Sequence, residues 1–90
     1  MPLTKRVRFY GRVQGVYFRR RTRDAASEYG VSGWVKNLPD GSVEAELSGD
    51  TDKVQRLIDY CQNEMPVARV DRVEITDMGY IDHIGFKIKY

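Results

Sequence analysis

The chain has 90 residues, with 15 Lys or Arg against 13 Asp or Glu, so its formal net charge is only +2. This length predicts one domain over residues 1–90, and so small a net charge is no argument by itself for nucleic-acid binding. The single cysteine, Cys61, excludes an internal disulfide, and neither a signal peptide nor a long apolar run is visible. We therefore expect a monomeric cytoplasmic protein that does not span a membrane.

The chain begins with a strand pattern. Residues 5–10 (KRVRFY) place Val7 and Phe9 on one face and polar or basic side chains on the other, which predicts a half-buried strand. The glycine-bounded stretch 11–15 follows, and it predicts a loop.

A helix and two strands are predicted next. Between Phe18 and Tyr29, apolar and small residues recur at helical spacing, and Gly30 stands where a helix commonly ends. Strand patterns follow at 31–37 and 42–48, and the Pro-Asp-Gly turn at 39–41 makes them antiparallel.

The second half of the chain repeats the plan of helix and strand. Asp50 or Thr51 is expected to cap a second helix, which Pro66 ends. Its apolar stripe consists of Val54, Leu57, Ile58 and Cys61. A fourth strand is predicted over 70–76, and the final residues 85–90 (GFKIKY) alternate again as a short last strand.

The order strand, helix, strand, strand, helix, strand is the plan of a split βαβ sandwich, an α+β fold. Two helices would cover one face of the sheet and leave the other face to water. Glu44 and Glu46 fall on that open face, so we expect both carboxylates to be solvated.

The topology predicts where two distant segments meet. In this plan the first two strands run parallel, with the third strand between them, so both end at the same edge of the sheet. Residues 11–18 leave the first strand there, and Asn37 ends the second. Because Asn37 shares parity with Val35, its side chain is expected on the helix-covered side.

This edge is suited to an anion. Glycines allow a loop backbone to turn its N–H groups inward, and the following helix begins with unpaired N–H groups and a positive dipole end. An arginine in the first helical turn can donate two hydrogen bonds to phosphate oxygens. Four arginines lie here, at positions 19, 20, 21 and 23, and spacing alone does not select among them. Solvation is expected for most of them, with Arg20 able to pair with Asp24.

Two long motifs make the sequence recognisable. The segments GRVQGVYFR (11–19) and GWVKNLPDGSVEAELSG (33–49) resemble the two signatures of the acylphosphatase family, and the ending GFKIKY is also similar. The resemblance covers essentially the whole chain. It implies a ferredoxin-like βαββαβ sandwich and hydrolysis of the carboxyl–phosphate bond of acyl phosphates, without metal or cofactor.

The resemblance also implies site residues. Arg19 would bind the substrate's phosphate, and Asn37 would orient the attacking water. The loop that holds the phosphate would comprise Gln14, Gly15, Val16, Tyr17 and Phe18. Tyr17 stands where many members have a smaller residue, and the Arg20-Arg21 pair is more basic than the family pattern. The small-molecule partners implied are an acyl phosphate and inorganic phosphate, as product and inhibitor.

Two other functions are compatible with the predicted fold. The first is RNA binding, because basic and aromatic residues would share the open sheet face: Arg6, Arg8, Tyr10, Trp34, Lys36, Lys87 and Lys89. Acidic residues on the same face and the missing RNA-recognition signature argue against it. The second is a regulatory domain that binds phosphate without turnover. His83 is expected in a surface loop, and Cys61 in the core.

Overall fold

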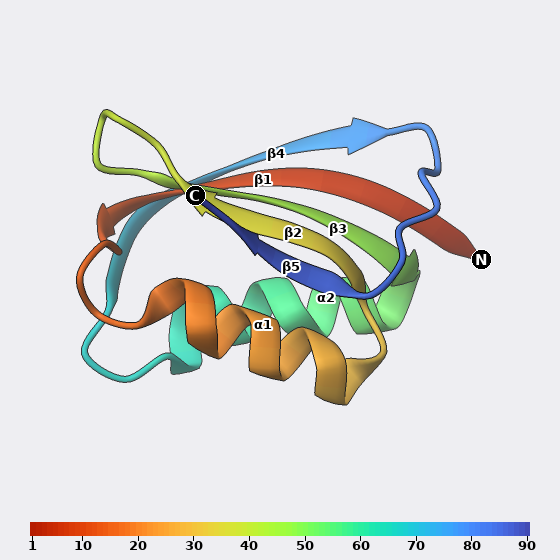
Figure 1. The fold of residues 1–90 in the computed structure, drawn as a ribbon, viewed down its shortest axis with the longest axis horizontal. Coiled ribbons are helices and arrows are strands. Elements are labelled where there is room, and N and C mark those ends of the chain that lie inside the picture. Colours follow the sequence, from red (N-terminus) through yellow and green to blue (C-terminus); the bar gives the residue numbers. More distant parts are fainter.

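The computed structural model describes residues 1–90 as a five-stranded sheet with two helices packed on one face (Figure 1). The elements are β1 (Pro2–Arg12), α1 (Phe18–Tyr29), β2 (Ser32–Asn37), β3 (Val43–Asp50), α2 (Thr51–Asp59), η1 (Tyr60–Glu64), β4 (Arg69–Met78) and β5 (Phe86–Lys89). The predicted order of elements and the α+β sandwich are confirmed. No helix has the length and apolar content that crossing a membrane requires.

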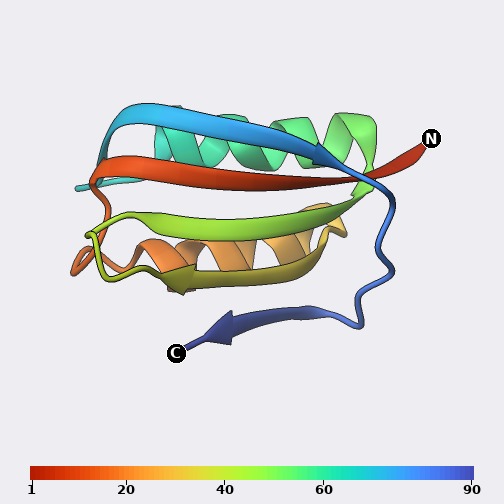
Figure 2. The same cartoon turned by 90° about the horizontal axis from the view of Figure 1, so that it is seen from above.

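The sheet order is β4-β1-β3-β2-β5. All neighbouring strands are antiparallel except β2 and β5, which run parallel, with Val35 beside Ile88 (Figure 2). Since β3 lies between β1 and β2 and opposes both, β1 and β2 run in the same direction, as the sequence predicted.

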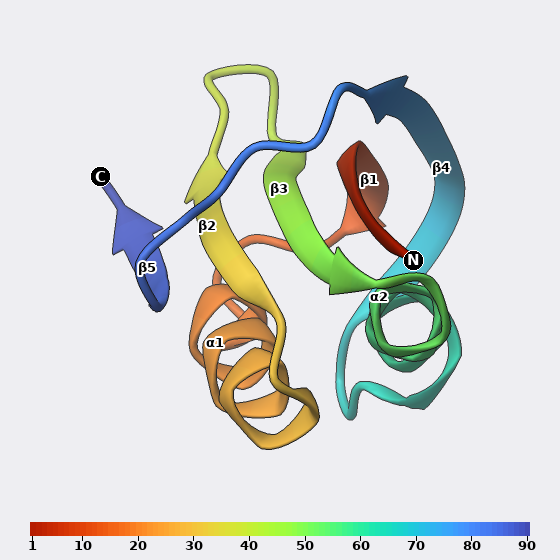
Figure 3. The ribbon, with the colours of Figure 1, turned by 90° about the vertical axis from the view of Figure 1, so that its right-hand side faces the viewer.

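The hydrophobic core fills the space between the sheet and the helices, which Figure 3 shows as two separate layers. The alternating side chains Val7 and Phe9 of β1 are fully buried in it, and the α1 stripe packs against them. The buried residues of that stripe are Phe18, Thr22, Ala25 and Ala26. Gly30 ends α1 in the left-handed conformation, with φ of 73°. The predicted helix and its end are therefore confirmed.

The second helix begins as predicted but without the predicted cap. Neither Asp50 nor Thr51 makes a capping hydrogen bond with its side chain, and the Thr51 hydroxyl instead donates to the Met1 carbonyl at 2.9 Å. After Asp59 the chain continues as the single π-helical segment η1, which buries Cys61. It ends at Glu64, and the next residue, Met65, is extended because a residue before proline avoids the helical conformation.

The sheet face opposite the helices is less open than expected. The side chain of Glu44 is 13% exposed and pairs with Arg8 at 3.2 Å, and Glu46 is only 3% exposed, so the prediction that both carboxylates are solvated was wrong. The Glu46 carboxylate accepts a hydrogen bond from Arg6 at 2.8 Å and lies 2.7 Å from the His83 ring nitrogen.

The segment 79–85 folds back over this face of the sheet. The N–H of Ile81 donates to Thr4 Oγ1 at 2.8 Å and holds the segment there. The sequence offered no sign of this segment's position.

Candidate active site

The ends of β1, β2 and β5 meet at one edge of the sheet. Figure 2 shows β2 and β5 pointing together toward the loop that follows β1. A pocket of about 420 Å³ opens at this edge, which is in the range of small-molecule sites. Its lining residues are Val13, Gly15, Tyr17, Phe18, Arg19, Arg20, Arg23, Asn37, Ile88 and Tyr90. The predicted meeting of the first loop with Asn37 is thus present in the structure.

The loop alternates between buried and exposed residues. Val16 and Phe18 are buried, and the Phe18 ring packs on Phe9 with centroids 5.2 Å apart. Gly15 and Tyr17 point outward and have positive φ values of 75° and 62°. A tyrosine in this left-handed conformation is uncommon and costs free energy. The two apolar anchors therefore hold a backbone curve that the loop would not adopt by preference.

This curve leaves several backbone donors free. The N–H groups of residues 15–20 have no hydrogen-bond acceptor, and the first helical bond is the one from Arg21 N–H to Tyr17 O at 3.0 Å. The positive end of the α1 dipole lies at the same place, and its first turn contains no acidic residue. Free N–H groups beside a helix N-terminus form a site for an anion.

The side chain of Gln14 forms its hydrogen bonds outside the pocket. Its Nε2 donates to Leu38 O at 2.8 Å and to Ser42 O at 2.9 Å, in the β2–β3 hairpin. Gln14 does not line the pocket. Within the predicted phosphate loop, this residue joins the loop to the segment that follows Asn37.

Asn37 faces the pocket with an incomplete set of hydrogen bonds. Its Oδ1 is buried and has no partner. An unpaired buried acceptor costs about 1–3 kcal/mol. The register Lys36–Lys89 between β2 and β5 brings Tyr90 beside Asn37. The amide is therefore placed where a bound molecule can supply the partner that it lacks.

Three of the four clustered arginines line the same pocket. The Arg19 guanidinium lies 5.0 Å from the centre of the Tyr90 ring, and that of Arg20 lies 5.9 Å from the Tyr17 ring. Arg23 also lines the pocket, whereas Arg21 borders a separate hollow. The predicted Arg20–Asp24 pair is not formed, because Asp24 pairs with Arg23 at 3.3 Å instead.

Sequence reasoning missed one wall of the pocket. Ile88 lies in β5 and Tyr90 directly follows it, and the place of β5 beside β2 was not predicted. The alternation of residues 85–90 did indicate that Phe86, Ile88 and Tyr90 share a face. A four-residue strand pattern does not specify which strand it pairs with, so the pairing of β5 with β2 could not be inferred.

The other candidate residues do not form a second reactive site. Burial raises the pKa of the Cys61 thiol to about 12, so this residue is a core component, as predicted. His83 lies in the loop before β5, as predicted, but its ring binds the buried Glu46. No three His, Cys, Asp or Glu side chains lie close enough together to hold a metal ion.

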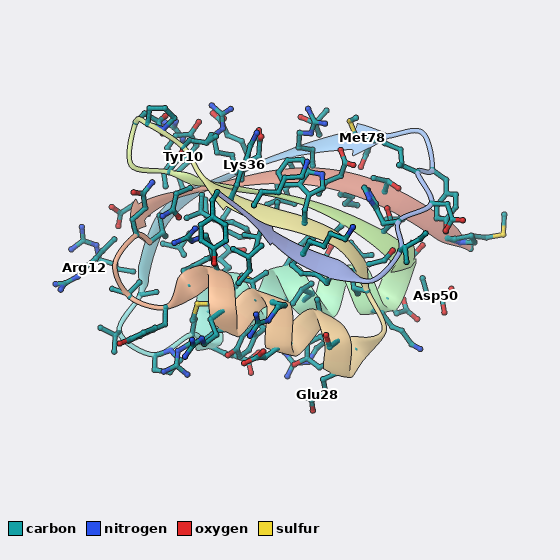
Figure 4. The ribbon with its side chains drawn as sticks, in the orientation of Figure 1. Tyr10, Arg12, Glu28, Lys36, Asp50 and Met78 are labelled. Atoms are coloured by element: carbon teal, nitrogen blue, oxygen red, sulfur yellow. The ribbon has the colours of Figure 1, made fainter.

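The open sheet face does not offer free aromatic rings. Figure 4 shows Tyr10 and Lys36 on the face away from the helices. The Tyr10 ring is covered by Arg72 at 4.0 Å, and Trp34 is 8% exposed beneath cationic side chains, the nearest being Lys89 at 4.5 Å. Stacking of RNA bases needs an accessible ring, so this arrangement does not favour the RNA-binding alternative.

Fold and site together define a ferredoxin-like α+β domain with a pocket that three arginines line. A model of the Acylphosphatase family matches residues 5–88. The chain is 52% identical over 89 residues to the acylphosphatase of Thermoplasma volcanium, covering 99% of each chain. The crystal structure of the Bacillus subtilis acylphosphatase superposes with a TM-score of 0.92 at 33% identity, covering 100% of both chains. The structure of an acylphosphatase from Coxiella burnetii superposes with a TM-score of 0.92 at 33% identity, covering 98% of this chain and 93% of the other. The chain belongs to the acylphosphatase family and is a hydrolase.

Proposed function

We propose that the chain hydrolyses acyl phosphates by direct attack of a water molecule that Asn37 orients, with the phosphoryl group held by Arg19 and the backbone of residues 14–19. One observation carries the assignment of these roles. The unpaired N–H groups of residues 15–20, a guanidinium without a carboxylate partner and the unpaired amide oxygen of Asn37 meet at one pocket.

The reaction needs no nucleophilic side chain. Water attacks phosphorus in line with the acyl oxygen, the bond between phosphorus and that oxygen breaks, and the carboxylate leaves with the bonding electrons. Charge on the phosphoryl oxygens is stabilised by the Arg19 guanidinium and the loop N–H groups. A water proton passes to the phosphate, because a neutral amide such as Asn37 is not a useful base. The products are a carboxylate and inorganic phosphate.

Several properties follow from this proposal. Inorganic phosphate should compete with substrate, because the loop that holds the phosphoryl group also fits the product. The step uses only groups of the chain and the substrate, with no metal or cofactor. The single buried thiol fits a reducing compartment such as the cytoplasm, and we expect the protein to act as a monomer.

The test is hydrolysis of benzoyl phosphate by purified protein in EDTA. The proposal expects hydrolysis well above the buffer rate and competitive inhibition by inorganic phosphate. Absence of acceleration over buffer would refute the proposed activity, and inhibition that saturating substrate does not relieve would refute the shared phosphate site.

Substitutions test the residue roles. Arg19→Ala should weaken phosphate inhibition and lower kcat by about 10³-fold, in the range of other transition-state arginines. Asn37→Ala should lower kcat while the phosphate inhibition constant changes little, because its proposed partner is water. Arg21→Ala is the control, since Arg21 borders a different hollow. Normal turnover by Asn37→Ala would assign the water to another residue.

A further inference from the structure

We propose that the pocket selects acyl phosphates whose acyl group carries a second negative charge, and that Arg20 and Arg23 bind that charge. This inference rests on the proposed function, because it assigns the two arginines to the acyl portion of the same substrate. Neither residue is needed to bind the phosphoryl group, because Arg19 and the backbone N–H groups of the loop are already assigned to it.

The pocket has more positive charge than one phosphoryl group needs. Arg19, Arg20 and Arg23 line it, and none of the other lining side chains is acidic. A bound phosphoryl dianion would compensate two of the three guanidinium charges, and the third, on Arg23, faces only the exposed carboxylate of Asp24, which does not line the pocket. A substrate with one additional carboxylate or phosphate would balance the pocket.

The excess of positive charge in the pocket is distinctive because the arginines outside this part of the chain are paired with carboxylates. Every arginine outside residues 12–23 pairs with a carboxylate: Arg6, Arg8, Arg56, Arg69 and Arg72. Arg12, Arg19, Arg20 and Arg21 have no such partner. In the pocket, Arg19 and Arg20 lie against the Tyr90 and Tyr17 rings, which hold a guanidinium without cancelling its charge. Arg23 has only the exposed Asp24 as a partner, a weak pairing that a bound anion can replace.

The helix itself is weakened by this arrangement. Arg23 follows Arg20 by three positions and Arg19 by four, and like charges at such spacings are unfavourable. Arg19 and Arg20 also stand in the first turn, where the helix dipole disfavours cations, and no acidic residue compensates them there. Residues that lower the stability of the element containing them are expected at functional sites. An anion bound to the three guanidinium groups removes both penalties.

Tyr17 contributes to the same subsite. It is 68% exposed at the rim of the pocket, fixed in a left-handed conformation, and its ring supports Arg20. Figure 4 shows Arg12 extending into solvent beyond the end of β1, so this unpaired arginine attracts anions to the edge without lining the pocket. The phosphoryl group would then lie at the loop N–H groups, with the acyl group directed toward Tyr17 and Arg20.

The experiment compares two substrates of equal shape, 4-carboxybenzoyl phosphate and 4-carbamoylbenzoyl phosphate, which differ in one charge. We expect kcat/KM to be about tenfold higher for the carboxylate, and this ratio to shrink as salt is added. Arg20→Gln and Arg23→Gln should each reduce the ratio at least threefold. Arg21→Gln removes the same charge from the same helix outside the pocket and should leave the ratio unchanged.

The outcomes separate this inference from the proposed function. If neither substrate is hydrolysed faster than in buffer, the proposed function fails. If both are hydrolysed with equal kcat/KM, or if Arg21→Gln lowers the ratio as much as Arg20→Gln, the acyl anion subsite is refuted and the hydrolase assignment stands. Circular dichroism of each variant confirms that the compared proteins are folded.

Discussion

Gln14 and Leu38 are joined by a hydrogen bond of 2.8 Å from the side-chain amide to the backbone carbonyl, so the loop after β1 is tied to the residue that follows Asn37. The same nitrogen donates to Ser42 O at 2.9 Å, across the base of the hairpin. One side chain therefore ties the backbone of the loop to the segment that follows Asn37.

Removing this tie should impair both stability and turnover. Gln14→Ala deletes two hydrogen bonds, which should lower the free energy of unfolding by about 1–2 kcal/mol. It also releases the loop from the hairpin, so kcat/KM for benzoyl phosphate should fall about tenfold. Urea unfolding and steady-state kinetics measure the two effects. Gln55→Ala is the control, because Gln55 bonds only to Asp59 on the surface, at 3.0 Å. Equal losses in the two variants would contradict the role given to Gln14.

Gly15 should be needed for its backbone conformation rather than for space. A Cβ atom at this position would meet no other atom within 4 Å, but φ is 75°, which costs an alanine about 1–2 kcal/mol. Gly85 is a matched control, with φ of 68° and the same open surroundings, in the loop before β5. Both Gly→Ala variants should lose similar stability, whereas only Gly15→Ala should lose kcat and phosphate affinity. A Gly15→Ala enzyme with normal kinetics would show that the loop tolerates another conformation.

The buried Glu46 should make stability depend on acid pH. Burial opposes ionisation of this carboxyl, but hydrogen bonds from Arg6 and His83 outweigh burial, so its pKa lies below the ordinary 4.5. The unfolded chain therefore takes up this proton at a higher pH than the folded chain does. The stabilisation from Glu46 is present above about pH 4.5 and is lost as the pH falls through the lowered value.

Glu46→Gln tests this dependence. At about pH 7 the variant should be roughly 1–2 kcal/mol less stable than the parent, because charged hydrogen bonds become neutral ones. The difference should shrink as the pH is lowered below about 4.5. Glu28→Gln is the control, because Glu28 projects from α1 into solvent (Figure 4). A stability difference for Glu46→Gln that stays constant down to about pH 3 would argue against an ionised Glu46.

Cys61 should report global unfolding through its reactivity. Burial raises the pKa of its thiol to about 12, so at about pH 8 almost none of it is the reactive thiolate. Iodoacetamide should therefore label the native protein very slowly and the urea-unfolded protein rapidly, as followed by mass spectrometry. Rapid labelling of the native protein would show that η1 opens without global unfolding.

The sequence predicted the features that depend on alternation and on chain connectivity. Val7 and Phe9 indicated the inner face of β1, and the strand order placed the loop and Asn37 at one edge without any knowledge of side-chain packing. The resemblance then supplied the choice of Arg19, which spacing could not make.

Other features depend on tertiary contacts that no local pattern contains. The burial of Glu46 requires the segment 79–85 to fold back and bring His83 to it. Arg20 and Arg23 line the pocket because the Phe18–Thr22 stripe fixes the rotation of α1, which a count of arginines does not show. Tyr90 becomes a wall of the site only because β5 pairs with β2.

The parallel pairing of β2 with β5 also sets when the site can exist during synthesis. Residues 11–37 carry the loop, the arginines and Asn37, yet Ile88 and Tyr90 arrive some fifty residues later in the sequence. A nascent chain that has displayed the whole loop after β1 therefore still lacks one wall of the pocket. The pocket is therefore complete only after β5 has docked beside β2, and we expect full activity to appear late in folding.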